Sequence, residues 1–402
     1  MSTGVSAQPP ITGNKAPKSS SLINRVIGGD FSLLPVLLSL LLIWVIFEII
    51  NPNFLSGRNL SNLVLQMAEI GTLAIAETFI LLLAEIDLSV AALSGVCGSI
   101  LGLLSANGVN PYLCILAALV VGAALGLFQG FWVTIIGVPA LIVTLAGQLG
   151  YQGLILVLLG QEGTIPISNN TLLGIASAYL GRWEGWVLGA VVVVLYAWSV
   201  LHNRAARKRM GLTLPSHSKT IGSIVAVVIG IGIVVYVLNS YNGIPVAGLI
   251  LFILVAGFAI LTQTTSFGRH LYAIGGNVEA SRRAGVNVRK MKIIIFTLSG
   301  VLGAAGGIIG ASRLGSSTTE AGGGDLLMDS IAAAVIGGTS LFGGRGSIWN
   351  ALAGALVIGS IENGMDLLSA PSSTKYLVEG SILLLAVTFD TITRRRRQRI
   401  GK

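Results

Sequence analysis

PVAGLILFILVAGFAILTQT (residues 245–264) and IIIFTLSGVLGAAGGIIGA (293–311) flank the polar segment FGRHLYAIGGNVEASRRAGVNVRKMK (267–292). Each flanking run is long enough to cross roughly 30 Å of hydrocarbon as a helix. The segment between them carries six Lys and Arg residues. Basic segments between membrane spans are concentrated on the cytoplasmic side. The stretch therefore predicts two membrane helices joined by a cytoplasmic segment.

The middle of this segment has the start and stop signals of a short helix. Asn277 can cap a helix start, and Glu279 lies in the first turn that would follow. Arg282 and Arg283 lie in the last turn, and Gly285 follows the end. The pattern predicts a capped helix of about two turns. A helix displayed towards the cytoplasm by a membrane protein suggests docking of a soluble partner.

Composition extends the membrane assignment to most of the chain. Hydrophobic residues make up 53% of it and charged residues only 10%, against roughly 25% charged in soluble domains. We expect an all-α, polytopic membrane bundle of about twelve transmembrane helices. The run 328–342 is short and glycine-rich, so it is expected to be broken or re-entrant. The expected spans are 32–50, 62–84, 88–106, 112–134, 139–159, 185–201, 220–238, 245–264, 293–311, 328–342, 347–368 and 374–391.

The distribution of basic residues predicts the orientation of these spans. With a cytoplasmic N-terminus and twelve crossings, 21 Lys and Arg fall inside and four fall outside, namely Arg58, Arg182, Arg313 and Lys375. Topology thus accounts for the net charge of +9, and no basic face is left that would indicate nucleic acid binding. The expected domains are a disordered cytoplasmic tail (1–31), a transmembrane domain (32–392) and a basic cytoplasmic tail (393–402).

Energy-coupling and catalytic motifs are absent from the sequence. There is no G-x-x-x-x-G-K-[ST] loop, since the one Gly-Lys pair is Gly401–Lys402. GGTSLFGGRGS (337–347) has Trp349 where a dinucleotide fingerprint needs Gly or Ala. Three His and two Cys residues have neither metal-ligand nor triad spacing. We expect no enzyme activity, no metal and no cofactor.

Three acidic residues lie at membrane depth, where charge is costly and calls for a functional hypothesis. Glu69 and Glu77 lie within the second expected span, eight residues apart. They could line one cavity, reach the interface or form a helix–helix hydrogen bond. Asp87 lies in AEIDLSV (84–90), where its carboxylate can accept hydrogen bonds from free N–H groups at the next helix start. Each is therefore a candidate for the translocation path or for a structural role.

Small residues and a weak internal repeat indicate how the helices pack. Gly122, Gly126 and Gly130 recur every four residues, which lets helices approach closely. The pair of spans on either side of EIDLSV (85–90) resembles in layout the pair on either side of LFGGRGS (341–347). Both pairs are expected to enter from outside, break inside and return, as duplicated halves of transporters do.

Several motifs, in order, resemble the permease subunits of bacterial ABC importers for monosaccharides, the ribose/xylose/arabinose/galactose group. The resemblance covers about residues 59–390 and is greatest to D-xylose permeases. Like them, the chain has an extra helical pair (185–201 and 220–238) joined by the basic loop RAARKRMG. The matching motifs are AEIDLSV (84–90), PALIVTLAGQLGYQGLIL (139–156), FGRHLYAIGGNVEASRRAGVNVRKMKIIIF (267–296), LSGVLGAAGGIIGASRLG (298–315) and DSIAAAVIGGTSLFGGRGS (329–347).

The resemblance implies a protein of the bacterial inner membrane with both termini in the cytoplasm. It also implies two permease chains, two copies of a separate ATPase and a periplasmic sugar-binding protein. The ATPase would grip the 267–292 loop. The coupling residues that it implies are Gly275, Gly276, Asn277, Glu279, Ala280, Arg282, Arg283 and Gly285.

Other functions stay open on the sequence alone. The cargo could be another monosaccharide, such as ribose, arabinose or galactose. A secondary transporter or channel could use Glu69, Glu77 or Asp87 as ion relays, and a membrane scaffold could recruit a soluble partner through the same loop.

Overall fold

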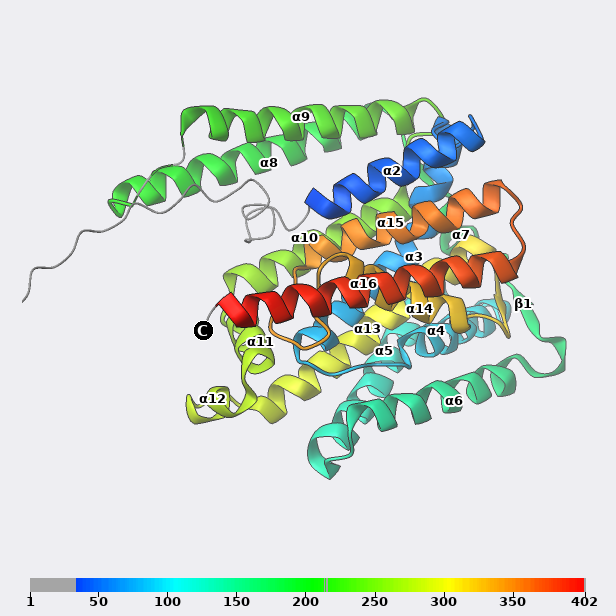
Figure 1. Cartoon of the computed structure of the whole chain (residues 1–402). Helices are drawn as coiled ribbons and strands as arrows, with labels where there is room; N and C mark the ends of the chain where they lie inside the picture. Colours follow the sequence, from blue (N-terminus) through cyan, green and yellow to red (C-terminus); the bar gives the residue numbers. More distant parts are fainter. Residues whose placement is uncertain (1–33, 213, 215, 401–402) are drawn as a thin grey trace, which may run out of the picture.

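The computed structural model describes residues 34–212, 214 and 216–400, which form a bundle of helices (Figure 1). The tail expected at 1–31 and the last two residues of the expected basic tail lie outside this range. The helices are α2 (Leu34–Ile50), α3 (Gly57–Leu82), α4 (Val90–Ala106), α5 (Pro111–Phe131), the π-helical η1 (Trp132–Ile136), α6 (Ala140–Leu159), the 3₁₀-helical η2 (Gly160–Glu162), α7 (Asn170–Ser177), α8 (Arg182–Arg209), α9 (His217–Asn239), α10 (Val246–Thr264), α11 (Ser266–Gly276), α12 (Val278–Arg283), α13 (Val288–Leu314), α14 (Gly324–Ile336), α15 (Ile348–Leu367) and α16 (Ser372–Ile400).

The predicted all-α membrane bundle is confirmed, and each expected span coincides with a helix. Within the described residues, seven helices are long and apolar enough to cross a membrane. They are α3, α5 with η1, α6 with η2, α8, α9, α10 and α13. The interruption expected at 328–342 is present, because α14 has only 13 residues and is about 20 Å long at 1.5 Å per residue.

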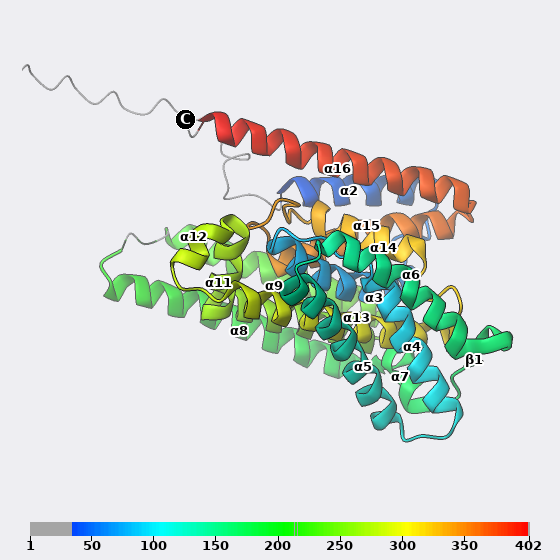
Figure 2. The ribbon, with the colours of Figure 1, turned by 90° about the horizontal axis from the view of Figure 1, so that it is seen from below.

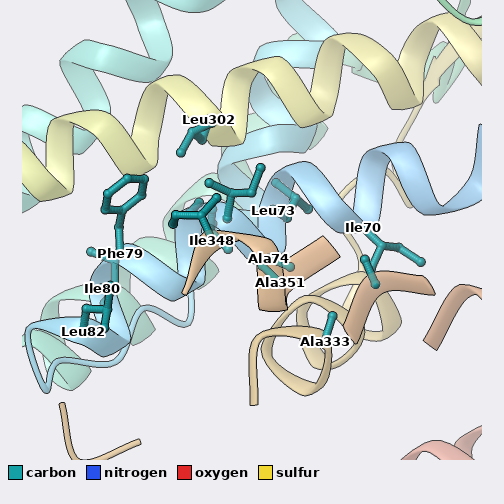
Figure 3. Close-up of a cluster of buried hydrophobic side chains, with 14 of the residues drawn as sticks. Ile70, Leu73, Ala74, Phe79, Ile80, Leu82, Leu302, Ala333, Ile348 and Ala351 are labelled. Carbon is teal, nitrogen blue, oxygen red and sulfur yellow. The ribbon is translucent and has the colours of Figure 1, made fainter. Parts of the chain in front are cut away.

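Helices α3 and α13 form the centre of the bundle. Their most apolar 18-residue windows are 78% and 67% buried, against 11% for both α8 and α9. Figure 3 shows the core between them, where side chains of α3 such as Leu73 and Phe79 lie beside Leu302 of α13. Ala333 of α14 and Ile348 of α15 belong to the same cluster. The extra pair α8–α9 therefore lies at the periphery of the bundle.

The expected close packing at the glycine stripe occurs between α5 and α13. A Cβ built on Gly126 would collide with the carbonyl oxygen of Phe296, and one on Gly300 with that of Gly122. The two backbones are thus in direct contact, which only glycine allows at these positions.

Two short antiparallel strand pairs lie outside the helices. β1 (Thr164–Pro166) pairs with β4 (Ser316–Thr318), and β2 (Tyr179–Leu180) pairs with β3 (Ile244–Pro245). Figure 1 places β1 and α7 at the end of the bundle opposite α11 and α12. The end of α16 lies at the α11–α12 end, and Figure 2 shows α16 along one edge of the bundle beside α2.

The two helix interruptions that resemble each other in layout meet in space. The first joins α3 to α4 through residues 83–89, with Ala84 at a positive φ of 61°. The second joins α14 to α15 through residues 337–347. The backbone N–H of Gly344 donates to the carbonyl of Leu82 at 3.0 Å. A hydrogen bond therefore holds the two breaks together.

Candidate functional site

The 267–292 segment contains more helix than the sequence analysis expected. α11 occupies most of its first half, and α13 begins at Val288 instead of residue 293. The polarity of the segment concealed α11. This helix buries one side through Gly268, Leu271 and Ile274 and exposes the rest. α13 begins early because the side chain of Asn287 caps it by accepting a hydrogen bond from the Lys290 N–H.

The predicted capped helix is α12. The side chain of Asn277 accepts a hydrogen bond from the Ala280 N–H at 2.9 Å, and Gly285 follows the helix end at a φ of 84°. α12 has six residues and is about 9 Å long, slightly shorter than expected. Arg282 pairs with Glu279 at 3.0 Å, and their side chains are 63% and 65% exposed. Since Ser281 is buried, α12 is anchored on one side and presents its charged residues to solvent.

Gly275, at the end of α11, packs directly against both helix breaks. A Cβ built on it would collide with the Leu82 carbonyl oxygen, and it would lie 2.5 Å from the Gly344 backbone nitrogen. The neighbouring Gly276 has open space at the same position. One turn earlier, the Tyr272 hydroxyl donates to the Gly346 carbonyl at 2.9 Å. The 267–292 segment thus contacts both helix breaks, the one between α3 and α4 and the one between α14 and α15.

A salt bridge makes a second connection between the segment and the first break. Lys292 of α13 pairs with Glu85, and both side chains are about four-fifths buried. Neither residue was predicted from the sequence to have a role. Opposite charges in two segments that were both expected on the cytoplasmic side were the available signal, but their separation of 207 residues left the pairing open.

Asp87 is the centre of a buried polar network at the first break. Its carboxylate accepts hydrogen bonds from the Ser89 N–H at 2.8 Å, the Ser89 hydroxyl at 2.6 Å and the Ser299 hydroxyl of α13 at 3.4 Å. Gln129 of α5 donates to the Ser89 hydroxyl at 2.6 Å. Asp87 thus accepts from the N–H of Ser89 just before α4, but Ser89 and not Asp87 occupies the N-cap position of that helix. The other members of the network were not predicted, although Gln129 is a polar residue within an apolar run.

We expect Asp87→Leu to destabilise the protein, because it leaves the buried N–H and hydroxyl of Ser89 without their acceptor. Unsatisfied buried groups cost about 1–3 kcal/mol each, so the free energy of unfolding in detergent should fall by about 2 kcal/mol or more. Asp87→Asn retains an acceptor oxygen and should lose less than half as much. Equal losses for the two variants, measured by denaturant titration, would contradict this role.

The structure separates Glu69 from Glu77. Glu69 pairs with Arg313 of α13 at 3.6 Å and lines a small cavity beside Gly98 and Gly307. Glu77 does not line that cavity and is fully buried. Neither of its carboxylate oxygens has a hydrogen-bond partner among the described residues. Glu69 thus forms an ion pair between α3 and α13 and also lines this cavity, and the two acids do not share it.

Polar residues also connect the helices at the end opposite α12. Asn59 of α3 donates to Asn363 of α15 at 2.7 Å, and Asn363 donates to Gln66 at 2.9 Å. Asp366 pairs with Lys375 of α16. These contacts fasten α3, α15 and α16 together at that end.

Comparison with known proteins identifies a family for most of the chain. The model of the family described as branched-chain amino acid transport system / permease component matches residues 59–387. The xylose transport system permease protein XylH of Haemophilus influenzae is 39% identical over 363 residues, 90% of this chain and 96% of that protein. XylH of Escherichia coli is 39% identical over 344 residues, 85% of this chain and 87% of that protein. The ribose import permease protein RbsC of E. coli is 32% identical over 361 residues, 88% of this chain and 92% of that protein. No solved structure matches the chain.

Proposed function

Because the chain belongs to the family of branched-chain amino acid transport system / permease components, we propose that it is the membrane-spanning permease of an ABC importer for a monosaccharide, D-xylose. The relatives named as xylose permeases at 39% identity, against 32% for the ribose permease, support this cargo. The matches cover nearly the whole membrane bundle. In this role the chain is a pore without enzyme activity of its own, and ATP is hydrolysed by a separate subunit.

The observation that carries the coupling role is the position of α11 and α12. α12 exposes Arg282 and Glu279 to a partner, and Gly275 of α11 rests on the backbones of both helix breaks. An ATPase that pulls on α12 would therefore move the points where α3–α4 and α14–α15 reverse. Since packed elements transmit displacement with little compression, such a movement would change the arrangement of the central helix α3.

The rest of the assembly follows from the same proposal. The permease is a homodimer in the bacterial inner membrane, and both chain termini lie in the cytoplasm with α11 and α12. The ATPase binds at the α12 end, and a periplasmic sugar-binding protein docks at the β1 end. The excess of Lys and Arg in the segments expected to be cytoplasmic supports this orientation.

Reconstitution in lipid vesicles with the partner ATPase and binding protein tests the function. ATP hydrolysis should be stimulated by xylose more than by ribose, arabinose or galactose, and xylose should accumulate in the compartment that holds the ATPase. The permease alone should transport no sugar. Proton-coupled sugar uptake by the permease alone would overturn the proposal in favour of a secondary transporter, and ATPase binding without sugar flux in the full assembly would favour a scaffold.

A further inference from the structure

A cavity that is open to the surface lies between helices α14 and α16, at the end of the bundle opposite α12. Its volume is about 180 Å³. Asp325, Asp329 and Ala332 contribute from α14, and Tyr376, Glu379 and Gly380 from α16. Along α14 the three residues are spaced by four and then three positions, and along α16 by three and then one. At these spacings each set of three lies on one side of its helix. These two stripes carry three carboxyl groups and a phenol, and the apolar side chains of Met328, Ile358 and Leu383 form the rest of the wall.

Asp329 is the unusual member of this wall. The residue is only 3% exposed, and among the described residues its carboxylate has neither a hydrogen-bond donor nor a basic partner. The carboxylates of Glu362, Glu379 and Asp325 act on it electrostatically. The basic residues Arg313 and Lys375 at this end are engaged by Glu69 and Asp366. Buried polar groups are usually hydrogen-bonded, so a ligand in the cavity that donates hydrogen bonds to Asp329 would satisfy its carboxylate.

The size and shape of the cavity indicate which ligand this is. Within the described part of the chain, no three His, Cys, Asp or Glu residues are placed to hold one metal ion. The cavity would hold about six water molecules at roughly 30 Å³ each, which suits one small ring. A neutral polyhydroxylated ring supplies several O–H donors to separated carboxylates, and its C–H face can lie against the ring of Tyr376.

We propose that the α14–α16 cavity binds the monosaccharide cargo, with the Asp329 carboxylate accepting hydrogen bonds from the sugar hydroxyls. This inference rests on the proposed function for the identity of the ligand. Asp329 is the sixth residue of α14, about 7.5 Å along the axis from its start. The cavity thus lies near the end at which sugar released by a binding protein would enter. It is the first site that the cargo meets inside the bundle.

Two substitutions test the site through different physical properties. Asp329→Leu removes the acceptor. Gly380→Leu fills the cavity, since a Cβ built on Gly380 meets no atom within 4 Å. Gly257→Leu on α10, where the Cβ position is equally open, and Glu320→Gln, an exposed acid outside the cavity wall, are the matched controls. Size-exclusion profiles and thermal denaturation of all variants report whether they fold.

Equilibrium dialysis with radiolabelled xylose on the full-length chain in lipid nanodiscs measures binding directly. We expect Asp329→Leu to weaken xylose binding by about 10- to 100-fold, the loss typical of a hydrogen bond to a charged group. Gly380→Leu should also weaken xylose binding, because its side chain takes up space in the cavity, and the controls should match the wild type. Asp329→Asn, which retains one acceptor oxygen, should fall between Asp329→Leu and the wild type. Xylose uptake by the full assembly should fall in the same order.

Three results would overturn the inference. The first is a wild-type chain that binds no xylose, and the second is a pair of folded cavity variants that bind and transport xylose like the wild type. The third is binding of Na⁺, K⁺ or Mg²⁺ that Asp329→Leu abolishes while xylose binding persists. In the second case sugar uptake by the wild-type assembly would leave the proposed function intact. A wild-type assembly that transports no sugar would instead reject the proposed function, whatever the dialysis shows.

Discussion

Gly275→Val should lower ATP-driven sugar uptake by about 100-fold while leaving the ATPase bound. The added side chain would collide with the backbones of Leu82 and Gly344, so no rotamer change can relieve the overlap. Overpacking typically costs about 1–3 kcal/mol. A variant that must displace backbone atoms should have a cost near the upper end of this range. Since each 1.4 kcal/mol corresponds to a tenfold change in an equilibrium constant, this cost corresponds to about 100-fold. The α12 surface is not altered, so the ATPase should still co-purify.

Gly276→Ala is the matched control for this prediction. The adjacent glycine has no atom within 4 Å of a built Cβ, so the added methyl group meets open space. Uptake and sugar-stimulated ATP hydrolysis by the reconstituted assembly should stay within about twofold of the wild type, a difference well below 1 kcal/mol. If Gly275→Val were folded and fully active, contact between α11 and the two breaks would not transmit the ATPase movement.

Reversing the charge of α12 should instead abolish binding of the ATPase, which Gly275→Val should leave bound. In the double variant Arg282→Glu and Arg283→Glu, two exposed basic residues of the last turn become acidic. An ATPase that docks on this basic end of α12 would present acidic residues to it, and like charges brought together at an interface cost several kcal/mol. Binding of the ATPase should therefore weaken by 100-fold or more. Pull-down of the ATPase by the tagged permease in detergent measures this directly.

The double variant Arg207→Glu and Lys208→Glu is the control, because it makes the same charge change at two adjacent exposed residues of α8. It should retain the ATPase. Loss of the ATPase in both double variants would show a general effect of charge on assembly or insertion instead of a contact at α12.

These two predictions depend on features that the sequence revealed to different degrees. The caps of α12 were predicted because Asn277, Glu279 and Gly285 act on backbone groups within one or two turns. The exposure of Arg282 was likewise expected for a displayed helix. The contact of Gly275 with Leu82 and Gly344 could not be predicted, because glycine pairs occur throughout this chain of 53 glycines.

The acidic residues illustrate the same limit. Asp87 was expected to bind N–H groups at the next helix start, and it does so over a separation of two residues. The partner of Glu69 is Arg313, on a helix more than two hundred positions later. Three alternatives for Glu69 were compatible with the sequence, and the ion pair with Arg313 could be found only once the packing of α3 against α13 was known.

By itself, the sequence determined the membrane class, the position of each apolar helix, the capped helix α12 and the bias of basic residues towards one side. Each of these is a local property, since hydropathy and capping act along contiguous residues. The tertiary structure alone decided that two distant helix breaks meet at Gly275 and that α14 and α16 enclose Asp329. Such contacts depend on which helix faces pack together, and that choice is made by the shape and burial of the whole bundle.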